Sequence, residues 1–395
     1  MVSAIATPQV QPIAMQGIAI PAAVVDKGEF LRRTRRHIQQ EKKISFTLGQ
    51  STQDIISLRK SDILSEINLH ITGSLTITPG TGSVGSTAEW PYNLIKNVSF
   101  AANGASTLIS ARGWTLRARE IAKDEGLSDR GNTQIIGGVS RSNGTLSLGS
   151  EAWGVGSATP TLGAQTVPVD LVLTIPVAED PFDLSGAIFL QSSSAELSVV
   201  LNWANTADLF TLAGNGAVTF AGNVEVVTTK FEIPTVNGAI VVPDLSLFHS
   251  LVETNTPVLS NGENETIVVG QGAGKYVLRV IYQHYNGAAG AAAPLPMTSG
   301  NFGLQAWRYG TAETPDQWPN GSMLRIAMER AYNCDLGGVL GYGVHEFAKA
   351  GFRDLVDMGV TSDLRLVSNI ANSVTLTSPK LWYAVESVYS AGKAA

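Results

Sequence analysis

Apolar and polar residues alternate along much of the chain, and this two-residue period predicts β-strands that bury one face. The clearest run places an apolar residue at every second position from Val167 to Val177. A first series contains strands at residues 44–48, 63–71, 98–100, 167–177, 197–203 and 224–231. A second series contains strands at residues 267–269, 277–282, 302–307, 374–376 and 381–385. The pattern therefore predicts an all-β protein with two consecutive β-sandwiches.

Short helices are expected to interrupt both series. Residues 113–126 carry Trp114, Arg117 and Ile121 at helical spacing. The corresponding helix of the second series is expected at Ser322–Tyr332, where a buried face is supplied by Leu324, Ile326, Ala327 and Ala331. A tight turn at Asn103-Gly104 is typical of a β-hairpin, because its central residues require positive φ angles.

The N-terminal region follows neither pattern at first. Residues 1–25 mix Gln, Pro, Ala and Ile without a sustained period, which predicts an extended arm that becomes ordered on a partner. Asp26 and Glu29 have the spacing of a capping box, and apolar residues then recur near helical spacing at Phe30, Leu31 and Ile38. We predict a short basic amphipathic helix at residues 27–41.

Turn residues mark the boundary between the two sandwiches. Pro234, Asn237-Gly238 and Pro243 punctuate the connection, and residues 244–253 are a short helical candidate. The expected organisation is an arm and basic helix at 1–43, a first sandwich at 44–233, a linker at 234–250 and a second sandwich at 251–395.

Composition supports a folded, two-core protein. The chain has 395 residues, of which 44% are hydrophobic and 15% charged, and this balance is unlike that of disordered proteins. One cysteine, Cys334, excludes an intrachain disulfide. No run approaches the roughly 20 apolar residues that span a bilayer, and the proline-interrupted opening stretch does not resemble a signal peptide.

Charge is distributed unevenly. The net charge is −6, yet residues 26–43 contain seven basic and three acidic residues, so this segment carries +4 and the remainder −10. An acidic chain is not expected to bind nucleic acid over its whole surface.

The sequence offers no convincing catalytic, cofactor or metal site. Its five histidines lack a recurring companion residue: His37, His70, His249, His284 and His345. Glu179, Asp180 and Asp183 crowd one turn, where backbone capping explains them better than catalysis or metal binding. The glycines at 270, 272 and 274 are expected to form a hairpin loop and no phosphate site, since no helix follows.

Two further features favour packing over chemistry. The tract Asn286–Ala293 is uncharged and contains only Gly and Ala after Asn286. This composition suits either a flexible loop or a contact between chains. Tryptophans lie beside alternating strands, so core or interface filling is favoured over stacking on sugars or bases: Trp90, Trp114, Trp203 and Trp382.

The order of these pieces resembles the double jelly-roll major capsid proteins of tectivirus-like, membrane-containing, tailless double-stranded DNA phages. The most specific similarity is the alternating strand to Val177, then the string Asp183-Leu184-Ser185-Gly186-Ala187, then the strand from Leu197 to Trp203. The resemblance implies a double jelly roll that acts as a structural protein and not an enzyme. It implies homotrimers that form pseudo-hexagonal blocks of an icosahedral virion, with no cofactor and no sequence-specific nucleic acid as partner.

The same resemblance implies partners for the assembled shell. These are neighbouring trimers, other capsid and vertex proteins, and an inner lipid membrane that the N-terminal arm meets. The expected membrane-facing residues are Arg32, Arg33, Arg35, Arg36, Lys42 and Lys43. Phe30, Leu31 and Ile38 are expected to touch the interface or the shell floor. The helix could instead pack on its own sandwich with the arginines solvated.

Two other functions remain open at this stage. One is an extracellular carbohydrate-binding or adhesin-like double β-sandwich, which requires an exposed aromatic platform. The other is a glycoside hydrolase that uses Glu179 and Asp183. For the capsid function, the expected location is the virion, after synthesis in the host cytoplasm.

Overall fold

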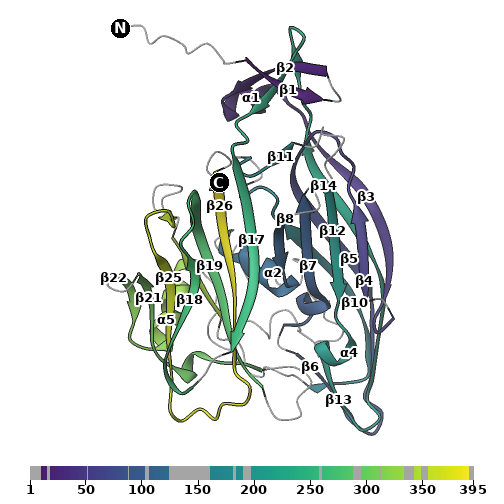
Figure 1. The fold of residues 1–395 in the computed structure, drawn as a ribbon. Helices are drawn as coiled ribbons and strands as arrows, with labels where there is room; N and C mark the ends of the chain where they lie inside the picture. The colour runs from purple at the N-terminus through teal and green to yellow at the C-terminus, as the bar shows by residue number, and fades with distance from the viewer. Residues whose placement is uncertain are drawn as a thin grey trace.

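The computed structural model describes residues 10–15, 18–50, 52–87, 89–102, 106–123, 161–180, 184–189, 197–257, 260–287, 295–310, 313–332, 342–347 and 355–390. Two β-sandwiches stand side by side, and a smaller β-sheet projects beyond one end (Figure 1).

The first sandwich pairs two four-stranded sheets. One sheet has the order β10 (Gln165–Ile175), β5 (Ile63–Thr78), β14 (Ala217–Phe231), β3 (Arg36–Thr47), with β11 (Ile188–Phe189) beside β5. The facing strands have the order β8 (Ser106–Ala111), β7 (Ile95–Ala102), β12 (Leu197–Trp203), β4 (Gln53–Ser57). β12 buries every second residue, as its apolar alternation predicts.

The second sandwich repeats this arrangement. Its first sheet has the order β20 (Leu295–Pro296), β19 (Lys275–Asn286), β26 (Lys380–Ser390), β17 (Leu247–Pro257), with β23 (Tyr342–Glu346) and β24 (Val356–Asp357) also paired with β19. The facing sheet has the order β18 (Gly262–Gly270), β25 (Asp363–Ile370), β21 (Phe302–Tyr309), β22 (Glu313–Trp318). Two sandwiches of paired four-stranded sheets confirm the predicted double jelly roll.

One contact joins the two jelly rolls into a continuous sheet. β8 of the first jelly roll runs parallel to β17 of the second, with Ile109 opposite Leu251 and Ser110 opposite Val252. This junction creates a ten-stranded sheet, and the buried apolar core continues across it. We call the region between the jelly rolls the seam.

Each jelly roll contains one longer helix, as predicted. These helices are α2 (Gly113–Lys123) and α5 (Gly321–Tyr332), and each follows a hairpin that begins after a short 3₁₀ helix, η1 (Tyr92–Leu94) or η3 (Ser299–Asn301). The predicted buried face of α5 is partly wrong. Leu324 and Met328 are buried, whereas Ile326 and Ala331 are exposed because α5 covers its sheet with only one edge.

The N-terminal region is more structured than the sequence predicts. In place of an arm without its own fold, β1 (Val10–Met15) and β2 (Ile18–Val25) form a hairpin. β2 also pairs in parallel with β16 (Ala239–Pro243), which is bound by β15 (Thr235–Val236). The segment between the jelly rolls thus supplies the partner strands that organise the N-terminal residues.

The predicted basic helix at 27–41 is correct only in its first half. α1 (Lys27–Arg33) begins at Asp26, whose carboxylate accepts the Glu29 backbone N–H at 3.0 Å. From Arg36 onward the chain forms β3, because it pairs with β14 along its whole length. Glu41 then points inward and binds the buried Lys230 ammonium at 2.7 Å.

Two other predicted elements are wrong. Residues 244–253 were expected to be helical, but β17 starts at Leu247 because this segment pairs with both β26 and β8. Val374 and Leu376 were expected in a strand, yet they lie in an irregular segment, where both are partly buried against the core. The remaining elements are α4 (Thr206–Leu209), β6 (Ser83–Ser86), β9 (Thr161–Leu162) and β13 (Phe210–Ala213), of which the three strands form a small sheet.

Candidate functional site

The α2 helix fills the seam, and all of its described side chains are buried or half-buried. It begins at Gly113, where a Cβ atom would overlap the Tyr92 carbonyl oxygen, so only glycine allows the helix to start this close to η1. Its apolar residues Trp114 and Leu116 belong to the core. Its polar residues Thr115 and Arg119 reach the second jelly roll, whereas Glu120 and Lys123 bind residues of the first.

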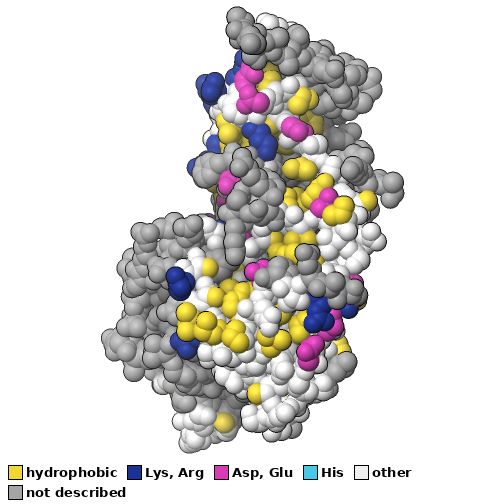
Figure 2. Space-filling model, turned by 90° about the vertical axis from the view of Figure 1, so that its left-hand side faces the viewer, with side chains coloured by type: hydrophobic (Ala, Val, Ile, Leu, Met, Phe, Trp, Pro, Cys, Tyr) yellow, Lys and Arg dark blue, Asp and Glu magenta, His cyan; other side chains and the backbone are white. Residues whose placement is uncertain are grey.

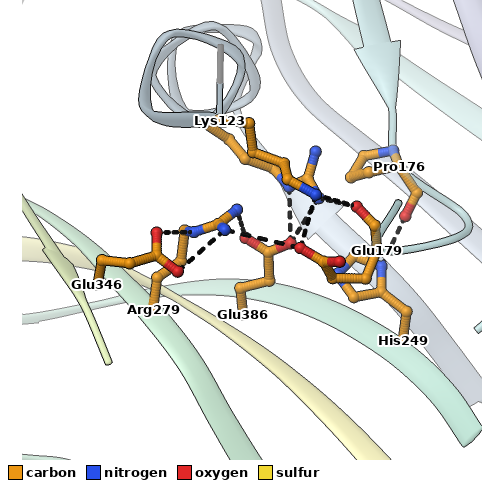
Figure 3. Close-up of polar contacts among 8 residues, drawn as sticks. Lys123, Pro176, Glu179, His249, Arg279, Glu346 and Glu386 are labelled. Atoms are coloured by element: carbon orange, nitrogen blue, oxygen red, sulfur yellow. Dashed lines mark hydrogen bonds and ion pairs between the residues drawn. The ribbon is translucent and has the colours of Figure 1, made fainter. Parts of the chain in front are cut away.

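A cluster of buried charges surrounds the C-terminal half of α2 (Figure 3). Arg119 donates from Nε and Nη2 to Oε1 of Glu386 on β26, at 2.8 and 2.6 Å. Arg279 on β19 donates from Nη1 to the other oxygen of the same carboxylate at 2.7 Å. The Glu386 side chain is completely buried, so all of its solvation comes from these partners.

The cluster extends in two directions from Glu386. Arg279 also forms a two-point contact with Glu346 on β23, with N···O distances of 2.7 and 3.1 Å. Lys123, the last residue of α2, binds the Glu179 carboxylate and its backbone carbonyl, each at 2.6 Å. Basic and acidic groups therefore alternate through the seam, as buried ion pairs require.

His249 on β17 completes the cluster. Its Nδ1 lies 2.7 Å from the Pro176 carbonyl oxygen, and its Nε2 lies 2.8 Å from Oε1 of Glu386. His249 therefore joins Arg119 and Arg279 as a third side chain in contact with the Glu386 carboxylate.

These contacts set the charge states of the cluster. Burial alone would raise the pKa of Glu386, but Arg119, Arg279 and His249 together hold it well below its usual value. Burial likewise opposes the charge on Arg279, yet Glu386 and Glu346 raise its pKa. The carboxylate and the guanidinium are both ionised because each needs the other.

A second polar cluster lies at the N-terminal end of α2. Arg112 donates from its backbone N–H and from Nε to Glu253 on β17, at 2.7 and 2.8 Å. Its guanidinium also donates to the Tyr285 hydroxyl at 2.6 Å and stacks 4.5 Å from the Trp382 ring centroid. Thr115 donates to the same Glu253 carboxylate at 2.9 Å. Both ends of α2 are therefore bound to the second jelly roll.

Two buried carboxyl groups near α2 have the opposite electrostatic character to Glu386. Burial raises the pKa of Glu89, which contacts the Tyr285 hydroxyl, and Arg112 offsets this only in part. Burial also raises the pKa of Glu120, although Arg117 and Thr174 counteract it. At these two positions burial outweighs the nearby arginines, so the pKa shift is opposite in direction to that of Glu386.

The string Leu184-Ser185-Gly186-Ala187 links the seam to the N-terminal region. Gly186 has φ of +88°, and a Cβ atom there would overlap His249. Ser185 accepts a hydrogen bond from Lys27 at 2.7 Å, and Leu184 packs in a small cluster with Phe30. Asp183, the first residue of the string, lies outside the described residues.

The predicted membrane-facing residues fall into two separate groups. Arg32, Arg33, Arg35 and Arg36 are exposed at the end of the molecule that carries α1, and Figure 2 shows basic side chains near this end. Lys42 and Lys43 lie about 20 Å from Arg36 along β3, at roughly 3.3 Å per residue. Lys43 is paired there with Glu225 at 2.7 Å.

The apolar residues of α1 do not form one outward face. Phe30 is completely buried against Ile63, Leu184 and Phe231, and Leu31 packs beside it. The expectation that Phe30 touches a membrane or the shell floor is therefore wrong, because it fixes α1 to the first jelly roll. Ile38, by contrast, is 64% exposed on β3.

The sequence-predicted chemistry residues have structural partners. Glu179 is bound by Lys123, and four histidines lie beside acidic groups: His37 by Asp62, His70 by Asp170, His249 by Glu386 and His345 by Asp316. His284 is buried in the second core, where burial lowers its pKa to about 3. Within the described segments, no group of His, Cys, Asp and Glu could hold a metal ion.

The decisive residues Arg119, Arg279 and Glu386 were not singled out by sequence reasoning. Each of them is a charged side chain inside an otherwise apolar strand or helix. Such a position indicates a buried ion pair, because an unpaired buried charge would strongly destabilise the fold. In the described part of the chain, no helix is long and apolar enough to cross a membrane.

Comparison with known proteins identifies the fold. No protein-family model and no curated protein matches the sequence. Among solved structures, the STIV MCP of Sulfolobus Turreted Icosahedral Virus covers 90% of this chain and 97% of its own, with a TM-score of 0.61 and 13% identity. The Faustovirus major capsid protein covers 90% and 91%, with a TM-score of 0.54 and 9% identity. The PBCV-1 virus capsid covers 90% and 94%, with a TM-score of 0.52 and 13% identity. The chain shares the double jelly-roll fold with these proteins.

Proposed function

We propose that this double jelly-roll chain is a major capsid protein that builds the shell of a virion. The observation that carries the proposal is the structural similarity, over 90% of this chain, to proteins named as capsid proteins. The seam adds a physical reason. The ion pairs Arg119–Glu386 and Arg279–Glu179 cross the seam and favour one relative orientation of the jelly rolls, and a repeating building block needs a constant shape.

The proposed assembly unit is a homotrimer in which six jelly rolls form a pseudo-hexagonal block. Within one chain, β8 and β17 already join two jelly rolls side by side. The outer edges β3 and β22 have no strand partner on their free sides within the described residues. Head-to-tail contacts between copies could continue the same arrangement, and such heterologous contacts produce a closed ring when the rotation fits.

The arginine-rich end is proposed to meet an inner membrane. Arg32, Arg33, Arg35 and Arg36 are exposed at this end, and juxtamembrane bases contribute about 1 kcal/mol each near an anionic surface. The sequence also allowed the helix to pack on its own sandwich. The buried Phe30 supports this packing, since it docks α1 on the first jelly roll. Membrane contact would therefore involve the arginines and the β1–β2 hairpin, and not an inserted α1.

The remaining proposed partners are those that a protein of a capsid shell would contact. They are neighbouring trimers, other capsid proteins and vertex proteins, with the virion as the location and the host cytoplasm as the place of synthesis. A carbohydrate-binding function gains no support from the described tryptophans, which are all buried or half-buried. No catalytic role is proposed, because the buried acidic groups of the seam are occupied by structural partners.

Light scattering and electron microscopy test the proposal. Purified protein at micromolar concentration should have the mass of a trimer, and particles that contain it should show pseudo-hexagonal blocks. Obligate interfaces of this type bury more than about 2,000 Å². A strict monomer under all salt conditions, together with particles in which this chain does not tile the shell, would refute the capsid function.

A further inference from the structure

The two jelly rolls are topological copies of one another. In chain order, β3, β4, β5, β7, β8, α2, β10, β12 and β14 correspond to β17, β18, β19, β21, β22, α5, β23, β25 and β26. The sheet order β10-β5-β14-β3 then matches β23-β19-β26-β17, and β8-β7-β12-β4 matches β22-β21-β25-β18. The two elements of the first jelly roll at the centre of the seam, β8 and α2, therefore have the counterparts β22 and α5 in the second jelly roll.

The helices α2 and α5 begin in the same way. A Cβ atom on Gly113 would overlap the carbonyl oxygen of Tyr92, the first residue of η1. A Cβ atom on Gly321 would overlap the carbonyl oxygen of Ser299, the first residue of η3. Alignment of these two glycines makes Thr115, Arg119 and Lys123 of α2 equivalent to Met323, Ala327 and Ala331 of α5.

The α2 helix covers the outer face of the sheet β23-β19-β26-β17. On this face, Glu386, Arg279 and Glu346 form an acid–base–acid row across β26, β19 and β23. Arg119 of α2 binds the first acid of the row. The cover is effective, since the Glu386 and Arg279 side chains are 0% and 5% exposed.

The equivalent face of the first jelly roll carries the same kind of row, and no helix among the described residues covers it. Glu225, His70 and Asp170 lie on β14, β5 and β10, the counterparts of β26, β19 and β23. His70 is 2.8 Å from Asp170 and 3.9 Å from Glu225, and these side chains are between 32% and 76% exposed. Beside them on β10, Val172 is an exposed apolar residue. We call this surface the outer β10–β3 face.

The α5 helix, by contrast, has apolar residues that nothing in the described part of the chain covers. Its residues equivalent to the seam face of α2 are small or apolar, and Met323 and Ile326 are each about half exposed. In α2, Thr115 and Arg119 of the same face are buried and bind Glu253 and Glu386 of the second jelly roll, and Lys123 is half-buried. One chain thus presents a helix with an uncovered apolar side and a sheet face that no described helix covers.

We infer that α5 of one copy docks on the outer β10–β3 face of a second copy, in the place that α2 occupies on the second jelly roll. This contact deepens the proposed function, on which it rests, by naming the surfaces that join neighbouring copies. It places the free edge of β22 beside the free edge of β3 of the next copy, as β8 lies beside β17. The apolar residues Met323 and Ile326 then gain a partner, and the row at His70 gains a cover.

Pairwise crosslinking tests the contact in the intact chain. In a Cys334→Ser background, one variant carries Ile326→Cys and a second carries Val172→Cys. After the two are mixed and treated with a short bis-maleimide, we expect a covalent dimer that neither variant forms alone. The control pair is Ile267→Cys with Val172→Cys, since Ile267 is 54% exposed on β18, at the edge of its sheet opposite β22. This pair should not crosslink.

A second measurement keeps the test independent of the cysteine variants. Ile326→Asp should raise the dissociation constant of the assembled protein at least about tenfold, whereas Ile267→Asp should leave it within about twofold. If light scattering shows trimers but the Ile326 and Val172 pair does not crosslink and Ile326→Asp dissociates nothing, the docking contact is wrong and the capsid proposal survives. A monomeric wild type overturns both.

Discussion

The Arg119 guanidinium and the Glu386 carboxylate meet at 2.6 Å in the seam, although 267 positions separate them in the chain. Arg119 belongs to the helix of the first jelly roll, and Glu386 belongs to the last strand of the second. This buried ion pair, which Arg279 and His249 support, holds the two jelly rolls in one relative orientation. Apolar burial alone would tolerate small rotations, whereas directional hydrogen bonds do not.

Glu386→Gln should destabilise the protein strongly. The substitution leaves the guanidinium groups of Arg119 and Arg279 without their carboxylate, and breaking a buried ion pair in this way costs about 3–5 kcal/mol. Urea denaturation measures the free energy of unfolding. Glu263→Gln, at an exposed position on β18, is the matched control and should change it by less than about 1 kcal/mol. Equal effects of the two variants would show that the seam does not depend on Glu386.

The pH dependence of stability should reveal Glu89. Burial raises its folded pKa above the ordinary value of 4.5, so its contribution is complete below pH 4.5 and is lost as the pH rises through the folded pKa. Glu89→Gln keeps a neutral group at every pH and should abolish this loss. Denaturation of both proteins across the acidic and neutral range would show a difference that grows with pH. A constant difference would contradict the raised pKa.

Glu386 should produce the opposite dependence. Its folded pKa lies well below 4.5, so its contribution is complete above pH 4.5 and is lost as the pH falls through the folded value. The stability advantage of the wild type over Glu386→Gln should therefore shrink in strong acid. If the advantage were unchanged there, the carboxylate would not be the source of the stabilisation.

Gly113→Ala and Gly321→Ala should each destabilise the fold. An added methyl group would collide with a backbone carbonyl of η1 or η3, and overpacking of this kind costs about 1–3 kcal/mol. Gly270→Ala is the control, because nothing lies within 4 Å of a Cβ atom at that position. Thermal denaturation should show two lowered melting temperatures and one nearly unchanged. A tolerated Gly321→Ala would weaken the structural equivalence of α2 and α5.

Phe30→Ala should release α1 from the first jelly roll. Removal of a completely buried phenylalanine typically costs about 3–5 kcal/mol, here concentrated in the small cluster around Leu184 and Phe231. Hydrogen exchange of residues 18–33 should accelerate at least tenfold while the strands of the sandwiches remain protected. Ile38→Ala, at an exposed position, should change neither region.

Liposome flotation tests the proposed membrane contact. Substitution of Gln for Arg32, Arg33, Arg35 and Arg36 should abolish flotation with anionic vesicles, because about 1 kcal/mol of attraction is lost per base. The Lys42 and Lys43 double variant should float nearly as well as wild type, since these residues lie away from the arginines. If the wild type and both variants float equally, or if none of them floats at any salt concentration, the proposed membrane contact is wrong and the arginines are simply exposed to solvent.

Sequence periodicity predicted the strands of the sandwiches because alternating burial is a local property. The predictions failed where distant pairing decides the local structure. A helix was expected where β17 starts, but this segment is a strand because it pairs with β26 and β8. The second half of the predicted basic helix is the strand β3 because it pairs with β14. The seam could be suspected only from charges such as Arg279 in an apolar strand, and its partners could not be known without the fold.

Glu386 lies on β26, whereas its partners come from α2, β17 and β19. Until β26 has joined β17 and β19, Arg119 and Arg279 lack their carboxylate, and the second jelly roll lacks a central strand. Closure of the seam is therefore a long-range step of folding, and such steps are slow because distant segments of the chain must first meet.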